Sequence, residues 1–352
     1  MLSIVVALLL AFGLALSAYH FVEVPLRSSA AIRRRPRYQV VIGGLGVMVL
    51  AAVLAVAIIR PIGHRIALSV TNDTSVWFPD QALDVGATCT IKDVVAPFGA
   101  GSMRTLAPDC PSSGKRLYVM GDSHAGACFP MFAAFAAKNA DTVIAFDFPG
   151  CGAFRLAQPQ AMGSEACGKF VNAALVSVTE TARPGDTLFL PSLRLVRTVD
   201  QWGFSDSPKT APDPQLRGQA IDEAIRLLGP LAGRGINIVF EAPKPIFRTP
   251  TFRCDDWFNR MNPICKFGFE EPRRVIEQKR EPVVSAMQAI AAKVPGVTIW
   301  DPLPLLCPSE ICNEFAHGKP LFVDADHVTR YGNSVLFPDF NDFVLRLPTR
   351  TG

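Results

Sequence analysis

Two long uncharged segments stand near the start of the chain. Residues 1–18 and residues 40–59 contain no charged side chain, and each is about long enough to cross a hydrocarbon core of roughly 30 Å. We therefore predict two transmembrane helices within residues 1–60. A cleaved signal peptide is the alternative for the first segment, because residues 15–18 resemble a cleavage site, but no Lys or Arg precedes its apolar run.

The hydrophobic pattern changes after residue 60. Residues 61–115 show no strong period, and we expect a linker and an irregular entry segment there. From residue 116, short apolar runs alternate with helical stretches, which is typical of parallel strands joined by helices. The predicted strands are Arg116–Met120, Thr142–Phe146, Asp186–Leu190, Ile236–Phe240 and Val297–Trp300. The predicted helices lie near Ala125–Lys138, Lys169–Thr181, Pro214–Leu231, Glu271–Val294 and Asn333–Leu345.

This alternation predicts an α/β fold for residues 116–352, a three-layer α/β/α domain with a mainly parallel sheet. Helices then cover both faces of the sheet, and ligands bind at the carboxyl ends of its strands. The motifs GxGxxG and GxxxxGK[ST] do not occur, so nothing favours a dinucleotide or ATP. No CxxC pair occurs either. We expect no cofactor and no metal.

Charge is distributed unevenly along the chain. Residues 1–60 contain six Arg and one Glu, whereas the rest contain 29 basic and 30 acidic residues. The near-neutral second part has no basic stripe that could follow a phosphate backbone, so nucleic-acid binding is a poor hypothesis. Short Arg-rich loops stay in the cytoplasm. The arginines between the two apolar segments therefore place everything after about residue 60 on the far side of the membrane; they are Arg27, Arg33, Arg34, Arg35 and Arg37.

All nine cysteines follow the second apolar segment. Disulfides persist outside the cytoplasm, which agrees with an exported domain. Pairing each cysteine with its neighbour gives four bridges, although one sequence leaves other connectivities open. These pairs are Cys89–Cys110, Cys151–Cys167, Cys254–Cys265 and Cys307–Cys312. Cys128 is left over, and its apolar surroundings predict a buried thiol.

Two short motifs carry the candidate chemistry. Gly121-Asp122-Ser123-His124 ends the first predicted strand and opens a helix, which puts a serine hydroxyl at the carboxyl edge of the sheet. The alternative is that Asp122 or Ser123 only caps the helix. Near the other end stands Asp324-Ala325-Asp326-His327. Asp324 could orient His327 while the ring takes a proton from a serine. Asp326 is an alternative partner, but adjacent to His327 it is worse placed to face the ring.

These two motifs resemble blocks I and V of the SGNH hydrolase superfamily. The resemblance implies an SGNH-like (flavodoxin-like) domain. It implies Ser123 as the nucleophile, His327 as the general base and acid, and Asp324 as the residue that orients His327.

The resemblance also suggests oxyanion-hole donors. In the superfamily a Gly after the second strand and an Asn after the third complete the hole. Gly150 falls where the Gly should be, and we favour it over Gly152. The Asn is missing; Ser192 or Arg194 could replace it, or both could be ordinary loop residues.

Residues 19–27 resemble the F-x-E-x-P-x-R end of the last core helix in membrane acyltransferases of the acyltransferase 3 type. In fused members a further transmembrane helix and an extracytoplasmic SGNH domain follow, and the cysteine positions of this chain look similar to theirs. The chain starts inside the last helix of that family's membrane domain. We expect a C-terminal part of such a protein, or a chain working beside a separate membrane subunit.

The resemblance implies an O-acyltransferase at the bacterial cytoplasmic membrane, with an extracytoplasmic (periplasmic) catalytic domain. It would move an acyl group, acetyl by preference, to a cell-surface or cell-wall glycan through an acyl-serine intermediate. The acyl donor would come from a membrane acyltransferase domain or subunit. One alternative is an SGNH-type carbohydrate esterase or deacetylase, with water as the acceptor. Another is a glycan-binding domain without activity.

Overall fold

We describe the protein from a computed structural model, which covers residues 2–66, 69–79, 82–86, 89–197 and 213–348. The chain forms two compact units, Met1–Leu68 and Ser69–Gly352. Each unit is described by itself below.

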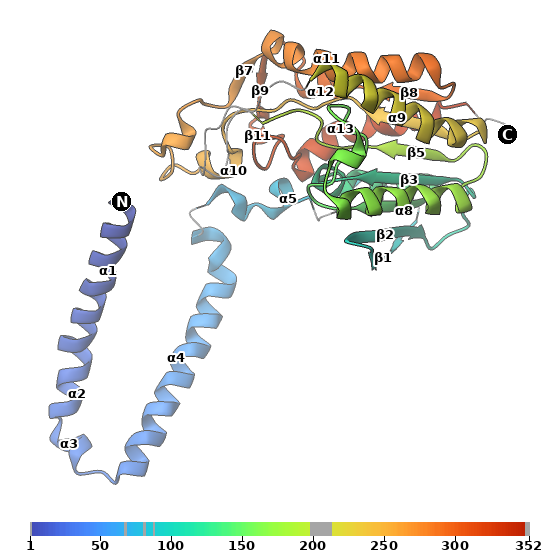
Figure 1. The fold of residues 1–352 in the computed structure, drawn as a ribbon. Helices are drawn as coiled ribbons and strands as arrows, with labels where there is room; N and C mark the ends of the chain where they lie inside the picture. The colour runs from blue at the N-terminus through green and yellow to red at the C-terminus, as the bar shows by residue number, and fades with distance from the viewer. Residues whose placement is uncertain (1, 67–68, 80–81, 87–88, 198–212, 349–352) are drawn as a thin grey trace. The chain divides into compact units, whose positions relative to one another are not determined.

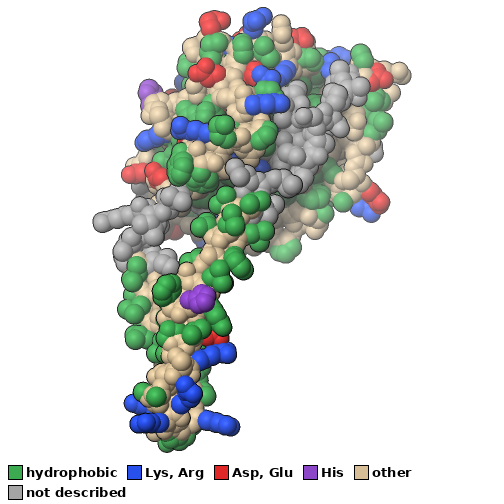
Figure 2. All heavy atoms as spheres, turned by 90° about the vertical axis from the view of Figure 1, so that its left-hand side faces the viewer, with side chains coloured by type: hydrophobic (Ala, Val, Ile, Leu, Met, Phe, Trp, Pro, Cys, Tyr) green, Lys and Arg blue, Asp and Glu red, His purple; other side chains and the backbone are tan. Residues whose placement is uncertain are grey.

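The first unit consists of two long apolar helical segments. Its elements are α1 Leu2–Ala18, a π-helical turn Tyr19–Glu23, α2 Val24–Ser28, α3 Ala30–Arg33 and α4 Arg37–Ile66. Val5–Ser28 and Arg37–Ile58 are long and apolar enough to span a membrane, and neither is buried by protein. The two predicted apolar helices are thus confirmed, although the first runs on to Ser28. Figure 2 shows hydrophobic side chains along these helices and basic side chains at the turn between them. Helices this apolar on all sides indicate a membrane anchor.

A seven-stranded sheet organises the second unit. Its strand order is β1-β2-β4-β3-β5-β6-β8. The strands are β1 Ile91–Phe98, β2 Gly101–Pro108, β3 Arg116–Gly121, β4 Thr142–Asp147, β5 Thr187–Leu190, β6 Asn237–Glu241 and β8 Val297–Trp300. The five strands from β3 onwards in this set run parallel, whereas β1 and β2 are antiparallel to their neighbours. Two small antiparallel pairs join β7 Glu270–Pro272 with β9 Ile311–Asn313, and β10 Phe315–Ala316 with β11 Lys319–Pro320.

Helices cover both faces of this sheet (Figure 1). The α-helices of the unit are α5 Thr74–Trp77, α6 Ser123–Ala127, α7 Phe129–Asn139, α8 Glu165–Thr181, α9 Pro214–Gly233, α10 Thr251–Cys254, α11 Arg273–Lys293, α12 Leu303–Leu306 and α13 Arg330–Leu345. In β3, Tyr118 and Met120 share a core with α8, α9 and α11, whereas Leu117 and Val119 share one with α7 and α13. Successive strand side chains point to opposite faces, so an all-apolar strand supplies both cores. The predicted three-layer α/β/α architecture is confirmed.

The segment that we expected to be irregular contains a β-hairpin. Strands β1 and β2 pair from Ile91 with Pro108 to Phe98 with Gly101, and β2 continues the sheet beside β4. Most side chains of β1 are exposed, and Lys92, Asp93 and Pro97 interrupt the apolar pattern that marks a buried strand. A Cβ on Gly101 would lie only 2.4 Å from the carbonyl oxygen of Asp147. The sheet edge therefore needs glycine at that position.

The predicted helix over residues 125–138 is divided in two. Helix α6 ends at Ala127, and α7 begins at Phe129 with Pro130 in its first turn. Proline lacks the backbone N–H that would bind the carbonyl of Gly126 in a continuous helix, whereas it fits the first turn of a new one. The division leaves Cys128 buried between the helices, where burial raises the pKa of its thiol to about 12. This buried free thiol agrees with the sequence-based expectation.

Four disulfides crosslink the second unit. They join Cys89 to Cys110, Cys151 to Cys167, Cys254 to Cys265 and Cys307 to Cys312. The nearest-neighbour pairing is confirmed. Each bridge closes a short local segment, so together they stiffen the hairpin and the loops rather than link distant parts of the sheet.

Candidate active site

Ser123 lies where strand β3 gives way to helix α6. Asp122 caps this helix, because its Oδ1 accepts the backbone N–H of His124 at 3.0 Å. Its Oδ2 accepts the backbone N–H of Leu193 at 3.0 Å, which ties the turn to the loop after the neighbouring strand β5. A Cβ on Gly121 would lie 2.0 Å from the carbonyl oxygen of Pro191. The glycine thus permits the close approach that holds Ser123 at the carboxyl edge of the sheet.

His327 reaches Ser123 from a tight loop before helix α13. Backbone hydrogen bonds hold this loop in place. In one of them the N–H of Val323 donates to the carbonyl of His327 at 2.7 Å. Oδ1 of Asp324 accepts the backbone N–H of His327 at 2.8 Å, and its Oδ2 lies 2.7 Å from the ring atom Nδ1. The opposite ring atom, Nε2, lies 2.8 Å from Oγ of Ser123. The structure therefore joins serine, histidine and aspartate in one hydrogen-bonded chain.

Asp326 forms a second contact with the same histidine. Its Oδ1 lies 3.0 Å from Nδ1 of His327, so it reaches the ring that we expected it to face poorly. The Asp326 side chain is 0% exposed, and both its oxygens are bound by the guanidinium of Arg197. His124 lies behind this pair, with its Nε2 3.6 Å from Asp326 and its ring centroid 4.4 Å from that of His327. Two carboxylates and the half-buried guanidinium of Arg197 thus fix the imidazole.

These contacts shift the pKa values of the site. Burial lowers the pKa of His327, but hydrogen bonds and negative charge from Asp324 and Asp326 outweigh it and raise the value to about 9. Burial raises the pKa of Asp326, yet hydrogen bonds from His327 and Arg197 bring it below its usual range. Burial, followed by the charge of His327, holds the pKa of His124 well below its usual value. At neutral pH the site therefore favours a charged His327 beside a neutral His124.

The candidate oxyanion donors lie in the loops after β4 and β5. Gly152 lies against the turn that holds the serine, because a Cβ there would be 3.1 Å from Oδ2 of Asp122. Gly150 has a φ of +79°, and its carbonyl accepts a hydrogen bond from Arg155. The hydroxyl of Ser192 is buried and has no hydrogen-bond partner among the described residues. These contacts leave the backbone N–H groups of Gly150 and Gly152 and the hydroxyl of Ser192 as the candidate donors.

Arg194 has a different role from the one considered for it. It is buried, its guanidinium lies 5.3 Å from the ring centroid of Phe240, and burial lowers its pKa to about 10. Its donors bind the backbone carbonyls of Ala153, Phe154, Leu190 and Glu241. Because these bonds hold the loops after three strands together, we do not retain Arg194 as an oxyanion donor.

Two side chains of this site were not identified from the sequence. Arg197 carries no motif, and it meets Asp326 across 129 positions of the chain. His124 stands in the first motif, but nothing in the sequence indicates its contact with Asp326. Only the folded chain brings these groups together.

The same groups could in principle hold a metal ion. Donor atoms of His124, Asp326 and His327 lie within 4.8 Å of one another in the described part of the chain. However, the guanidinium of Arg197 already binds both oxygens of Asp326 and would repel a cation. The arrangement suits an ion pair beside a catalytic histidine better than a metal centre.

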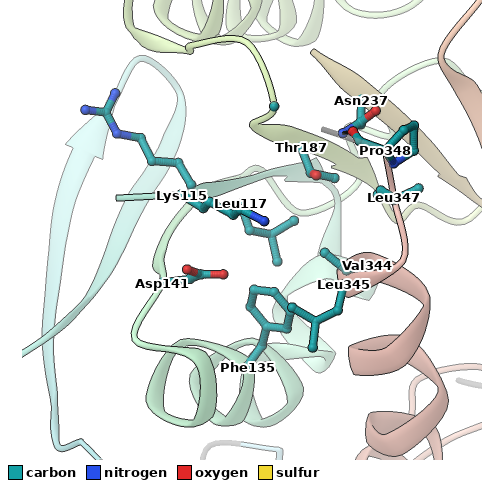
Figure 3. Close-up of a pocket in the computed structure, with 12 residues that line it drawn as sticks. Lys115, Leu117, Phe135, Asp141, Thr187, Asn237, Val344, Leu345, Leu347 and Pro348 are labelled. Carbon is teal, nitrogen blue, oxygen red and sulfur yellow. Dashed lines mark hydrogen bonds between the residues drawn. The ribbon is translucent and has the colours of Figure 1, made fainter. Parts of the chain in front are cut away.

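A small pocket lies at the opposite edge of the sheet (Figure 3). Lys115, Leu117, Thr187 and Asn237 line it at the amino ends of β3, β5 and β6, together with the end of α13. Asn237 donates to the carbonyl of Pro348 at 3.1 Å, and Pro348 also lines this space. It is separate from the serine site, which occupies the carboxyl ends of the strands.

Comparison with solved structures finds matches of low identity. The periplasmic domain of a lipopolysaccharide acetyltransferase from Salmonella ser. Paratyphi A is 14% identical, with a TM-score of 0.43 over 67% of this chain and 86% of that chain. A putative acylhydrolase from Bacteroides fragilis is 11% identical, with a TM-score of 0.35 over 68% and 91%. A putative arylesterase from Agrobacterium tumefaciens is 11% identical, with a TM-score of 0.37 over 66% and 100%. The comparison with curated protein sequences finds no match.

One family model matches most of the second unit. It is described as an SGNH domain (fused to AT3 domains), and it covers residues 88–342. This range includes the β-hairpin, the whole seven-stranded sheet, and both the serine and histidine motifs. Because the match extends over well more than half of the chain, the protein belongs to the family of SGNH domains that are described as fused to AT3 domains.

Proposed function

We propose that the protein is an O-acyltransferase that moves an acetyl group to a hydroxyl of a cell-surface or cell-wall glycan. The observation that carries the proposal is the hydrogen-bonded chain from Ser123 through His327 to Asp324. This arrangement activates a serine for acyl transfer. The acyl group would come from a membrane acyltransferase domain or subunit of the AT3 type.

In the proposed reaction, Nε2 of His327 takes the proton of the Ser123 hydroxyl as its Oγ attacks the donor carbonyl. The tetrahedral intermediate collapses to an acyl-serine, and His327 returns the proton to the departing group. A glycan hydroxyl then gives its proton to His327 and attacks the acyl-serine. As this second tetrahedral intermediate collapses to the ester product, His327 returns the proton to Oγ of Ser123. The N–H of Ser123, with Gly150 or Gly152 and with Ser192, would stabilise the oxyanion at each stage.

We place the reaction on the outer side of the cytoplasmic membrane. The Arg-rich turn between the two apolar helices favours a cytoplasmic position for that turn. Four disulfides in the second unit favour an oxidising compartment. The acceptor glycan would therefore meet the site outside the cytoplasm.

The full chain, incubated with a soluble acetyl ester, should acetylate the peptide that contains Ser123. Added glycan should then increase acetylated glycan at the expense of free acetate, because acceptor and water compete for one intermediate. Mass spectrometry of the protein and of the glycan measures both products. Release of free acetate alone, at every glycan concentration, would identify an esterase instead.

The pH dependence of kcat/KM with a soluble ester should follow His327. Only the unprotonated ring accepts a proton, and its pKa is raised to about 9. We therefore expect kcat/KM to fall about tenfold per pH unit below this value and to level off above it. Initial rates between pH 6 and pH 10 measure the profile; a flat profile over this range contradicts the assignment of the base.

A further inference from the structure

One loop of the second unit exposes three large apolar side chains together. Trp257, Phe258 and Met261 are 66%, 46% and 95% exposed. All three belong to the loop between Cys254 and Cys265. Large apolar groups gathered on a soluble surface usually mark a contact with another molecule or with a membrane.

The loop has a defined shape that keeps these side chains outside. The disulfide Cys254–Cys265 closes it, and consecutive turns fill it, with backbone N–H groups of Asn259 and Asn262 bound within the loop at 2.9 and 2.8 Å. The rings of Trp257 and Phe258 pack edge to face, with centroids 5.7 Å apart. A loop crosslinked in this way cannot fold its apolar groups back onto the domain without losing these contacts.

The loop is also fastened to the segment that follows the membrane anchor. Within the second unit, Oδ1 of the buried Asp256 accepts the backbone N–H of Val70 at 2.8 Å. Val70 lies twelve positions after Ile58, the end of the second candidate span. Twelve residues reach at most about 40 Å when fully extended. Chain connectivity therefore limits how far the loop can lie from the bilayer surface.

The exposed charges of the loop suit an anionic surface. Arg260 in the loop and Lys266 directly after it are exposed, whereas the acidic residues of the loop, Asp255 and Asp256, are half-buried and buried. Tryptophan prefers the headgroup region of a bilayer, where its ring is partly apolar and partly hydrated. Nearby Lys and Arg gain from anionic lipid headgroups.

We propose that the disulfide-closed loop Cys254–Cys265 is a membrane-contact loop. It inserts Trp257, Phe258 and Met261 into the headgroup region of the bilayer that holds the two apolar helices, with anionic phospholipid around Arg260 and Lys266. This contact gives the second unit a fixed orientation at the membrane surface. The inference does not depend on the catalytic assignment.

Lipid quenching of tryptophan fluorescence tests the proposal in the full chain. The protein is reconstituted into vesicles of phosphatidylethanolamine and phosphatidylglycerol whose acyl chains carry bromine close to the headgroup. We expect quenching in the original protein and loss of most of it in Trp257→Phe. Two of the other three tryptophans, Trp77 and Trp300, are buried in the protein, and all three remain in both proteins, so the difference reports Trp257.

Val176→Ser is the matched control, because Val176 is an equally exposed apolar residue on α8; it should leave the quenching unchanged. Quenching should weaken when phosphatidylglycerol is removed or salt is raised. Equal quenching of the original protein and Trp257→Phe overturns the proposal. The proposal is also overturned if residues 255–263 become protected from hydrogen exchange in vesicles that contain a membrane acyltransferase and stay unprotected in vesicles without it. The partner of the loop would then be a protein.

Discussion

Ser123→Ala should abolish acyl transfer, with a fall in kcat of about six orders of magnitude, the scale seen when a serine nucleophile is removed from a catalytic triad. The hydroxyl that would carry the acyl group is then gone, and neither His327 nor Asp324 offers a replacement in its position. The variant should fold normally, because Ser123 opens a short helix whose cap is the side chain of Asp122. Acetyl transfer to glycan and cleavage of a soluble ester measure the loss.

Two further serine variants complete this experiment, one as a control and one as a test of the oxyanion donor. Ser334→Ala removes an exposed hydroxyl that bonds only to the carbonyl of Tyr331, among the contacts described, and it should leave activity unchanged. Ser192→Ala should lower kcat by about a hundredfold or more if Ser192 donates to the oxyanion. Full activity of Ser123→Ala with unchanged thermal stability would show that the triad is wrong, and the glycan-binding interpretation would then gain support.

His327→Ala should lower kcat nearly as much as loss of the serine, because members of a triad act as a unit. Asp324→Asn should cost less, about four orders of magnitude, because the nucleophile and the base remain while the ring loses its preferred tautomer. Steady-state rates of the purified variants give this order. Equal rates for the original protein and Asp324→Asn would assign the orienting role to Asp326 instead.

Asp326→Asn separates the two carboxylates through its pH profile. The negative charge of Asp326 is one of the causes that raise the pKa of His327. Its removal should therefore lower the pKa of His327, so that the fall of kcat/KM with decreasing pH begins at a lower pH. Asp324 still orients the ring in this variant. An unchanged profile would mean that Asp326 stabilises the loop through Arg197 without acting on the histidine.

Much of the architecture follows from local sequence patterns. The five parallel strands are short apolar runs, because each is buried on both faces, and the helices between them have the length of crossover connections. The hairpin from Ile91 to Pro108 was missed for the opposite reason, since β1 is mostly exposed and Lys92, Asp93 and Pro97 interrupt its apolar positions. The division at Cys128 could have been recognised from Pro130, because proline fits the first turn of a helix and not its interior.

The sequence by itself determined the layered fold and the two apolar helices, because apolar periodicity and segment length are properties of short stretches. It suggested the disulfide pairs by nearest-neighbour spacing, and the structure selected that pairing from the other connectivities. The sequence also singled out Ser123, Asp324 and His327, because each stands in a compact motif. Only the tertiary structure decided what surrounds them. Arg197 meets Asp326 through the packing of separate loops. Ser192 and Arg194, two positions apart, differ in their contacts: the described residues offer the Ser192 hydroxyl no hydrogen-bond partner, whereas backbone carbonyls bind the guanidinium of Arg194. Such contacts depend on where the chain returns in space, which no local pattern encodes.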